Sequence, residues 1–495
     1  MTNRSDDVRL SALDLETDAF RRIGHRLVDR MADFLLSLPS RSVTSGQSAG
    51  LLRQALGEGP VPDEGADPET TIDEITSLLL EHSLFNGHPR FMGYITSSGA
   101  PLGMLGDLVA ATINPNCGSF GLSPVATLIE EQVVRWTAEL LGLPPATGGL
   151  LVSGGNMANM VGFWAARAAR ATWNVREEGL SGTAPRLVAY CSAETHTWIQ
   201  KAADLSGLGT SAVRWIPTDR DQRMIMEALE SQIEADKANG LSPFLVVGTA
   251  GTVGTGAVDP LRAIARVCRQ HGLWFHVDGA YGAPAVVAPE APPDLAGMAD
   301  ADSVAVDPHK WLYAPLEAGC AFVRDPAALK AAFSYHPTYY KFESGEPEPP
   351  PNYYELGPQN SRGFRALKVW LGLRQAGRNG YARSIGQDIR LSRELFDLAG
   401  AHPELEAVTN SLSITTFRYV PPGTDPAAPD QGALNALNDR ILGALQQSGR
   451  AYVSNAVVGG RFLLRACIVN FRTTSTDLRM LCDAVVDIGR NLSKL

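Results

Sequence analysis

The chain has 495 residues, which is too long for one hydrophobic core, so about two to four structural units are expected. Its 44% hydrophobic and 19% charged residues are typical of a soluble globular protein, and the net charge of −10 argues against a nucleic-acid or anionic-membrane surface. The six cysteines are scattered without a CxxC pair, which argues against disulfides and a bound metal. The N-terminus is polar, which argues against a signal peptide, and the apolar runs are too short for a membrane span. We therefore expect a cytoplasmic protein.

The first part of the chain, residues 1–85, is expected to be a helical segment. Residues 8–38 have the apolar spacing of an amphipathic helix, which Pro39 ends. Such a helix has little core of its own, so we expect it to pack on the partner subunit of a dimer, with packing on its own chain as the alternative. Residues 40–69 are rich in Ser, Gly, Pro and acidic residues and predict a linker, and residues 72–82 predict a second helix.

A loop-like stretch from His88 to Gly99 mixes aromatic side chains with hydroxyl groups. This mixture suits the wall of a ligand site, although simple loop packing explains it equally well. A helix is expected over residues 102–112, followed by a polar turn over residues 114–120. A long helix from Pro124 to Leu141 then begins with proline in its first turn.

Residues 86–378 are expected to form a large α/β domain, because short apolar runs alternate with helical segments from Leu150 to about Val323. This alternation predicts a mainly parallel sheet that is buried on both faces. The expected strands are 187–191, 213–216, 244–249, 273–277, 303–306 and 320–323, and the expected helices are 156–171, 197–206, 222–235 and 260–270.

Residues 333–358 have no periodicity, several prolines and five tyrosines, which predicts either a functional lid or a disordered segment. Residues 379–495 are expected to form a small α+β domain. Its expected helices are 382–398, 432–448 and 475–493, and its expected strands are 411–420 and 461–470. A further helix is expected over residues 364–374, at the end of the large domain.

Two sequence features point to a bound ligand. The turn Ser153-Gly154-Gly155-Asn156 opens a helix, where free N–H groups and the helix dipole favour a phosphate, although an ordinary capped turn has the same sequence. Asp278 ends a buried strand, where a carboxylate is costly unless it meets a cation or hydrogen-bond donors. A protonated pyridine nitrogen is one such partner, and a helix cap is the alternative.

A lysine directly after a buried strand is the third feature. Asp307-Pro308 ends the strand 303–306, and His309-Lys310 follow. Such a lysine can act as an amine nucleophile that forms a Schiff base with a carbonyl, although a surface lysine is the simpler interpretation of the pair alone. Together with His196, which taken alone could be a capping histidine, the phosphate turn, the aspartate and the lysine are the parts that pyridoxal 5'-phosphate requires.

With these residues, the chain resembles the group II pyridoxal-phosphate-dependent amino-acid decarboxylases, which include aromatic-L-amino-acid, glutamate and cysteine-sulfinate decarboxylases. The resemblance covers nearly the whole chain. It is carried by HPRFMGYI, SGGNMAN, AETHTWIQKA, HVDGAYG, DPHKW, HPTYY and GPQNSRGFRALKVW. It implies a fold-type I, aspartate-aminotransferase-like enzyme that works as a homodimer with active sites at the interface.

The resemblance also implies roles for individual residues. Lys310 would carry the cofactor, Asp278 would pair with the ring nitrogen, and His196 would stack on the ring. The other cofactor contacts would be Gly155, Asn156, Thr252, Asp307 and His309, and the substrate contacts would be Tyr94, Ser97, Asn116 and Arg465. A structural ion pair is the alternative for Arg465. Many relatives have Ser or Thr where this chain has Asn156, which leaves side-chain detail at the phosphate open.

The implied reaction is α-decarboxylation of an L-amino acid. Tyr339 would return a proton to the α-carbon, with Tyr340, Tyr353 and Tyr354 as alternatives. Relatives with phenylalanine at the loop position tend to release aldehydes, so a tyrosine there favours simple decarboxylation. The aromatic wall around Tyr94 favours aromatic substrates, whereas the polar turn 114–120 is closer to relatives that act on acidic ones. An aldehyde synthase, a Cα–Cβ lyase and a cofactor-free scaffold are further alternatives.

Overall fold

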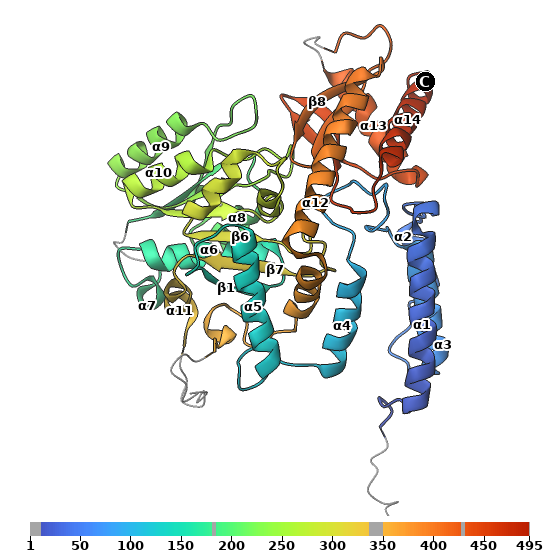
Figure 1. The fold of residues 1–495 in the computed structure, drawn as a ribbon. Coiled ribbons are helices and arrows are strands. Elements are labelled where there is room, and N and C mark those ends of the chain that lie inside the picture. The colour runs from blue at the N-terminus through green and yellow to red at the C-terminus, as the bar shows by residue number, and fades with distance from the viewer. Residues whose placement is uncertain (1–10, 181–184, 336–349, 427–430, 495) are drawn as a thin grey trace, which may run out of the picture.

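The computed structural model describes residues 11–180, 185–335, 350–426 and 431–494. Its N-terminal helices form an arm beside the rest of the molecule (Figure 1). In this arm α1 (Thr17–Ser37) lies along α3 (Pro68–His82), and arginines of α1 form ion pairs with Glu69 and Asp73 of α3. The expected helix start was wrong for residues 11–16, which precede α1, and the expected linker contains a short helix, α2 (Ala49–Leu56), capped by Ser48.

A seven-stranded sheet forms the centre of the larger lobe. Its strand order is β1-β7-β6-β5-β4-β2-β3, and β6, β5, β4, β2 and β3 are parallel. The strands are β1 (Gly148–Val152), β2 (Leu187–Ser192), β3 (Val213–Ile216), β4 (Ser242–Thr249), β5 (Trp274–Asp278), β6 (Ser303–Val306) and β7 (Gly319–Val323). The expected mainly parallel sheet is confirmed, but β1 was missed, and β7 runs antiparallel to both of its neighbours.

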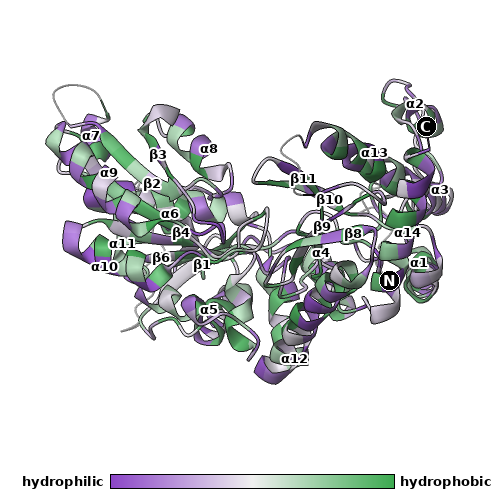
Figure 2. Cartoon of the chain, turned by 90° about the horizontal axis from the view of Figure 1, so that it is seen from above, coloured by the Kyte–Doolittle hydropathy of each residue, from purple (hydrophilic) through white to green (hydrophobic). Residues whose placement is uncertain are grey.

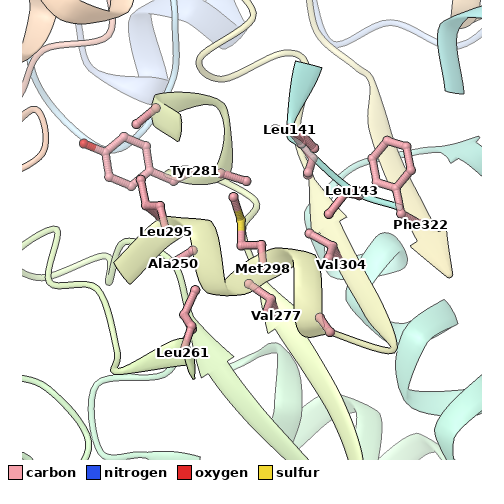
Figure 3. Close-up of a cluster of buried hydrophobic side chains, with 14 of the residues drawn as sticks. Leu141, Leu143, Ala250, Leu261, Val277, Tyr281, Leu295, Met298, Val304 and Phe322 are labelled. Carbon is pink, nitrogen blue, oxygen red and sulfur yellow. The ribbon is translucent and has the colours of Figure 1, made fainter. Parts of the chain in front are cut away.

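Helices cover both faces of this sheet because alternate strand residues point to opposite sides. Val277, Val304 and Phe322 face a cluster with Leu261 and Met298 (Figure 3). The residues that alternate with these along each strand, such as Ala305, point to the opposite face of the sheet, where they pack with helices α6 and α8. The helices of this lobe are α4 (Pro101–Ile113), α5 (Pro124–Leu140), α6 (Gly155–Arg170), α7 (Val175–Glu178), α8 (Trp198–Leu205), α9 (Met226–Ala238), α10 (Leu261–His271) and α11 (Ala327–Phe333).

The long helix α12 (Ala366–Ala401) joins the two lobes, which Figure 2 shows from above. Gly377 interrupts it with a positive φ of 60°, so the two helices expected there meet end to end. The smaller lobe has a four-stranded antiparallel sheet in the order β10-β11-β9-β8, covered by helices α13 and α14. Its elements are β8 (Leu405–Ser411), β9 (Ile414–Tyr419), α13 (Gly432–Ser448), β10 (Ser454–Val458), β11 (Arg461–Cys467) and α14 (Ser475–Leu492).

Strands β8 and β10 were not expected from the sequence, and the division into residues 1–85, 86–378 and 379–495 remains a prediction. None of the helices in the described ranges combines the length and apolar character that a membrane span needs.

Candidate active site

A small cavity of about 100 Å³ lies where β5 and β6 end, next to the start of α6. Ligands of mainly parallel sheets bind at this edge, beyond the carboxyl ends of the strands. The cavity brings together six residues that the sequence singled out. They are Gly155, Asn156, His196, Asp278, Asp307 and Lys310, and the remaining lining residues are Ile95, Asn159, Val253, Ala280 and Tyr281.

The glycine turn lies at one end of the cavity, where α6 begins. Gly154 has a φ of 130°, which favours glycine, and Gly155 is the first residue of the helix. A methyl group on Gly155 would lie 2.5 Å from Asp307 Oδ2, so a side chain does not fit at this position. The free N–H groups at the start of this sixteen-residue helix therefore meet the cavity and can bind an anion.

Lys310 follows Asp307 in a turn in which Lys310 N–H donates to Asp307 O. The Lys310 Nζ atom lies 3.0 Å from Asp307 Oδ2, and His309 Nε2 lies 3.8 Å from the same oxygen. Asp307 is buried, and its other oxygen, Oδ1, has no partner among the described atoms. The pair keeps the lysine amine at the cavity and neutralises part of the charge of a buried carboxylate.

Packing around Trp311 holds the lysine turn in place. The Trp311 indole is fully buried, stacks on Tyr281 with a centroid distance of 4.9 Å and donates to Asp388 Oδ2 at 2.9 Å. Burial raises the pKa of Asp388 to about 7. Since Tyr281 lines the cavity, the residue next to Lys310 is fixed to a wall of the site.

Asp278 lies at the end of β5 and is 6% exposed. Trp198 Nε1 donates to its Oδ2 atom at 2.7 Å, and Ala280 N–H donates to its Oδ1 atom at 3.2 Å. No lysine, arginine or histidine of the described ranges forms an ion pair with this carboxylate. The site thus contains a buried carboxylate that has no ion-pair partner among the described residues and faces the cavity, which is the environment that a ligand cation requires.

His196 lies at the cavity with its side chain partly open to solvent. Its Nδ1 atom accepts a hydrogen bond from the Trp198 backbone N–H at 3.2 Å. Partial burial lowers the pKa of His196, and the nearby Lys310 ammonium acts in the same direction. A neutral imidazole ring at this position is suited to stacking on a flat ligand.

Four further expected residues do not line the cavity, and each of them has a polar group bonded within the protein. The Ser97 hydroxyl donates to His309 O at 2.8 Å. The Thr252 hydroxyl bonds Thr255 and accepts from Ala257 N–H, while the adjacent Val253 lines the cavity. Asn116 Oδ1 accepts hydrogen bonds from the backbone N–H groups of Gly118 and Arg362. His309 Nδ1 is bonded to the backbone of Ala318.

Arg465 and Tyr94 lie together beside the cavity. Arg465 Nη1 donates to Tyr94 O at 3.2 Å and to Ser454 Oγ at 2.9 Å. Arg465 is only 2% exposed, yet its Nε and Nη2 atoms have no partner, and no described carboxylate forms an ion pair with it. The ion-pair interpretation of this arginine therefore has no support in the described residues, and the free N–H groups are available to an anion.

The loop tyrosines are only partly described. Tyr339 and Tyr340 lie outside the described residues. Tyr353 is buried under the Arg362 guanidinium at 4.6 Å, and burial raises its pKa strongly. Arg362 in turn forms a buried ion pair with Glu130, so Tyr353 belongs to the packing of this region.

Comparison with known proteins agrees with this arrangement. Residues 53–420 match the model of the pyridoxal-dependent decarboxylase conserved domain. The chain is 30% identical to the aromatic-L-amino-acid decarboxylase of Bacillus atrophaeus over 97% of this chain and 98% of that protein. It is 32% identical to tyrosine decarboxylase 3 of Petroselinum crispum over 92% and 88% of the two chains, and 29% identical to the phenylacetaldehyde synthase of a Rosa hybrid cultivar over 92% and 90%.

Among solved structures, the chain is similar to Oryza sativa TDC with PLP and tryptamine. The TM-score is 0.88 at 29% sequence identity, and the match covers 98% of this chain and 100% of that one. The whole length of the chain, including both lobes, is therefore accounted for by one type of architecture.

Proposed function

We propose that this chain, which belongs to the pyridoxal-dependent decarboxylase family, removes the α-carboxylate of an aromatic L-amino acid and releases the amine. Membership of the family makes it a pyridoxal-phosphate-dependent carboxy-lyase. One observation carries the assignment of the reaction to this cavity: the buried carboxylate of Asp278, which has no ion-pair partner among the described residues, lines the same cavity as Lys310.

The residues of the cavity fit the cofactor at both of its charged ends. The N–H groups at the start of α6 suit its phosphate, and the space beside Gly155 would be lost with any side chain. Asp278 suits a protonated ring nitrogen. When bound there, pyridoxal phosphate supplies a ring that withdraws electrons from the bonds at the substrate's α-carbon.

We assign the following work to the protein's own residues. Lys310 would provide the amine that holds the cofactor, and Asp278 would keep a proton at the ring nitrogen. His196 would cover the ring, and Gly155, Asn156, Asp307 and His309 would surround the phosphate, with Thr252 near the ring. Tyr339 would return a proton to the α-carbon after carbon dioxide leaves, and exclusion of water by its loop would protect that step.

The aromatic preference rests on the wall beside the cavity and on the named relatives. Phe91 stacks on Tyr452 at 5.4 Å, Tyr94 lies 6.2 Å from Tyr452, and Ile95 lines the cavity. Tyr94 has a positive φ of 51°, and Arg465 holds its carbonyl group. An aromatic side chain can pack on the exposed ring of Tyr94, which the stack of Phe91 and Tyr452 supports.

A second candidate, an acidic substrate, is favoured by one observation. Arg465 is buried with two unpaired groups, and a carboxylate is the natural partner for them. In the aromatic proposal Arg465 binds the α-carboxylate of the substrate. In the acidic proposal it binds the side-chain carboxylate of glutamate, aspartate or cysteine sulfinate. Tyr94, Ser97 and Asn116 would be the further substrate contacts in either case, although Ser97 Oγ and Asn116 Oδ1 already bond the protein backbone.

The substrate proposal is tested with the twenty amino acids, DOPA and cysteine sulfinate, with carbon dioxide, amine, aldehyde and ammonia all measured. We expect kcat/KM for an aromatic substrate to exceed that for any acidic one by about 100-fold or more, because an aromatic wall leaves a second carboxylate poorly solvated. A preference for an acidic substrate would reverse the assignment. Aldehyde and ammonia as main products would indicate a synthase, and no carbon dioxide from any substrate would contradict the proposal.

The proton donor is tested by Tyr339→Phe, which removes the hydroxyl and keeps the ring. We expect amine formation to fall by about 100-fold, a typical loss for an acid–base group, with a larger share of aldehyde and ammonia. Tyr335→Phe is the matched control, because its ring packs under Arg176 at 4.4 Å, and it should leave the products unchanged. Unchanged amine output from Tyr339→Phe would place the donor elsewhere, and Tyr340→Phe then identifies it.

We also propose a homodimer in the cytoplasm. The arm helix α1 buries no residue, and α1, α4 and α5 expose a series of large apolar side chains, which a second copy would cover. These are Phe20, Val28, Met31, Leu105, Leu108, Ile113, Val125 and Leu128. Sedimentation equilibrium should give twice the chain mass of 52.9 kDa, whereas a single-chain mass would contradict the dimer.

The cysteines support the proposed compartment. All six are unpaired and buried, which suits a reducing compartment such as the cytoplasm.

A further inference from the structure

Trp198 contacts two of the residues assigned to the cofactor. Its indole Nε1 donates to Asp278 Oδ2 at 2.7 Å, and its backbone N–H donates to His196 Nδ1 at 3.2 Å. Trp198 is the first residue of α8 and is completely buried. Trp198 therefore contacts both His196, which is assigned to cover the cofactor ring, and Asp278, which is assigned to the ring nitrogen.

The indole of Trp198 is held rigidly by its neighbours. Phe163 meets it edge-on at 6.5 Å, and the ring of His276 meets it edge-on at 5.6 Å. Phe163 belongs to α6 and His276 to β5, so a helix and a strand both contact the indole. Because the ring has no space to rotate, its N–H direction is fixed before any ligand binds.

The charge of Asp278 is not neutralised by the nearby histidine of its own strand. His276 is fully buried, and burial lowers its pKa to about 4. Its ring nitrogens are already bonded to Ser303 Oγ and Asn159 Oδ1, each at 2.7 Å. Trp198 and Ala280 thus supply the two hydrogen bonds that hold the Asp278 carboxylate, and both donors are neutral.

We propose that Trp198 is a positioning residue of the reaction: its indole N–H fixes the Asp278 carboxylate for a protonated ring nitrogen, while its backbone N–H, which every variant at this position retains, binds His196 Nδ1. Each carboxylate oxygen can accept two hydrogen bonds, so Oδ1 and Oδ2 both keep acceptor capacity toward the cavity. This inference rests on the proposed function, because it needs a cofactor with a basic ring nitrogen.

The test compares two ligands of the cofactor-free protein: pyridoxal phosphate and an analogue in which a CH group replaces the ring nitrogen. Wild type should bind pyridoxal phosphate more tightly, and Trp198→Phe should reduce this preference by about tenfold, the usual worth of a hydrogen bond to a charged group. Affinity is measured by equilibrium dialysis, without turnover. A role in packing alone would weaken both ligands equally and leave the preference intact.

Trp274→Phe is the matched control. Trp274 is buried on the same strand as Asp278, and its indole donates at 2.7 Å to Ser303 Oγ, a neutral acceptor. It should leave the ligand preference unchanged, with a comparable loss of thermal stability. Trp198→His, which keeps a ring N–H, should recover part of the preference and covers the case in which the phenylalanine variant does not fold.

The binding measurements separate a role for the Trp198 indole from a failure of the proposed function. Equal weakening of both ligands by Trp198→Phe, unchanged binding of both, or the same loss of preference in Trp274→Phe would overturn the role of Trp198. A loss in Trp198→His as large as in Trp198→Phe would do the same. Wild type that binds neither ligand would instead refute the proposed function, and the two failures are therefore distinguishable.

Discussion

The uncompensated carboxylate of Asp278 is the constraint on which the rest of the site depends. A buried carboxylate without a cation costs several kcal/mol, even when neutral donors satisfy part of its hydrogen bonding. Here it is held by Trp198 and Ala280, and the nearby His276 stays neutral. The fold therefore maintains a site for positive charge before a ligand arrives, which is the preorganisation that catalysis requires.

The sheet topology explains why Asp278, Asp307 and the start of α6 lie at the same cavity. Asp278 ends β5, Asp307 follows β6, and the two strands are adjacent and parallel, so their carboxyl ends share one edge of the sheet. Helix α6 starts at the same edge and brings its N–H groups. The smaller lobe supplies Arg465 from β11, and Asp388 of α12 holds Trp311 beside Lys310, so both lobes are needed to complete the cavity surroundings.

The central sheet and several residues of the site could be predicted from the sequence, but the side-chain contacts within the site could not. The alternation of apolar runs and helices predicted the parallel sheet, and distinctive neighbours marked Gly155, Asp278 and Lys310. Trp198 and Tyr281 were missed, because a buried aromatic residue has the same sequence signal whether it fills a core or orients a carboxylate. Ser97 and Thr252 were singled out for hydroxyl groups that the structure uses to hold backbone, a choice that depends on distances which no local pattern encodes. The strands β1, β8 and β10 were missed because β1 begins with two glycines, and β8 and β10 contain polar residues that weaken the apolar signal.

The assignment of Lys310 as the amine that holds the cofactor underlies every other role in this cavity. It is tested most directly by reducing the cofactor-loaded protein with borohydride, digesting it and locating the added mass by peptide sequencing in a mass spectrometer. We expect one labelled lysine, Lys310, and no label in Lys310→Ala. Label on another lysine, or equal labelling of the alanine variant, would contradict it.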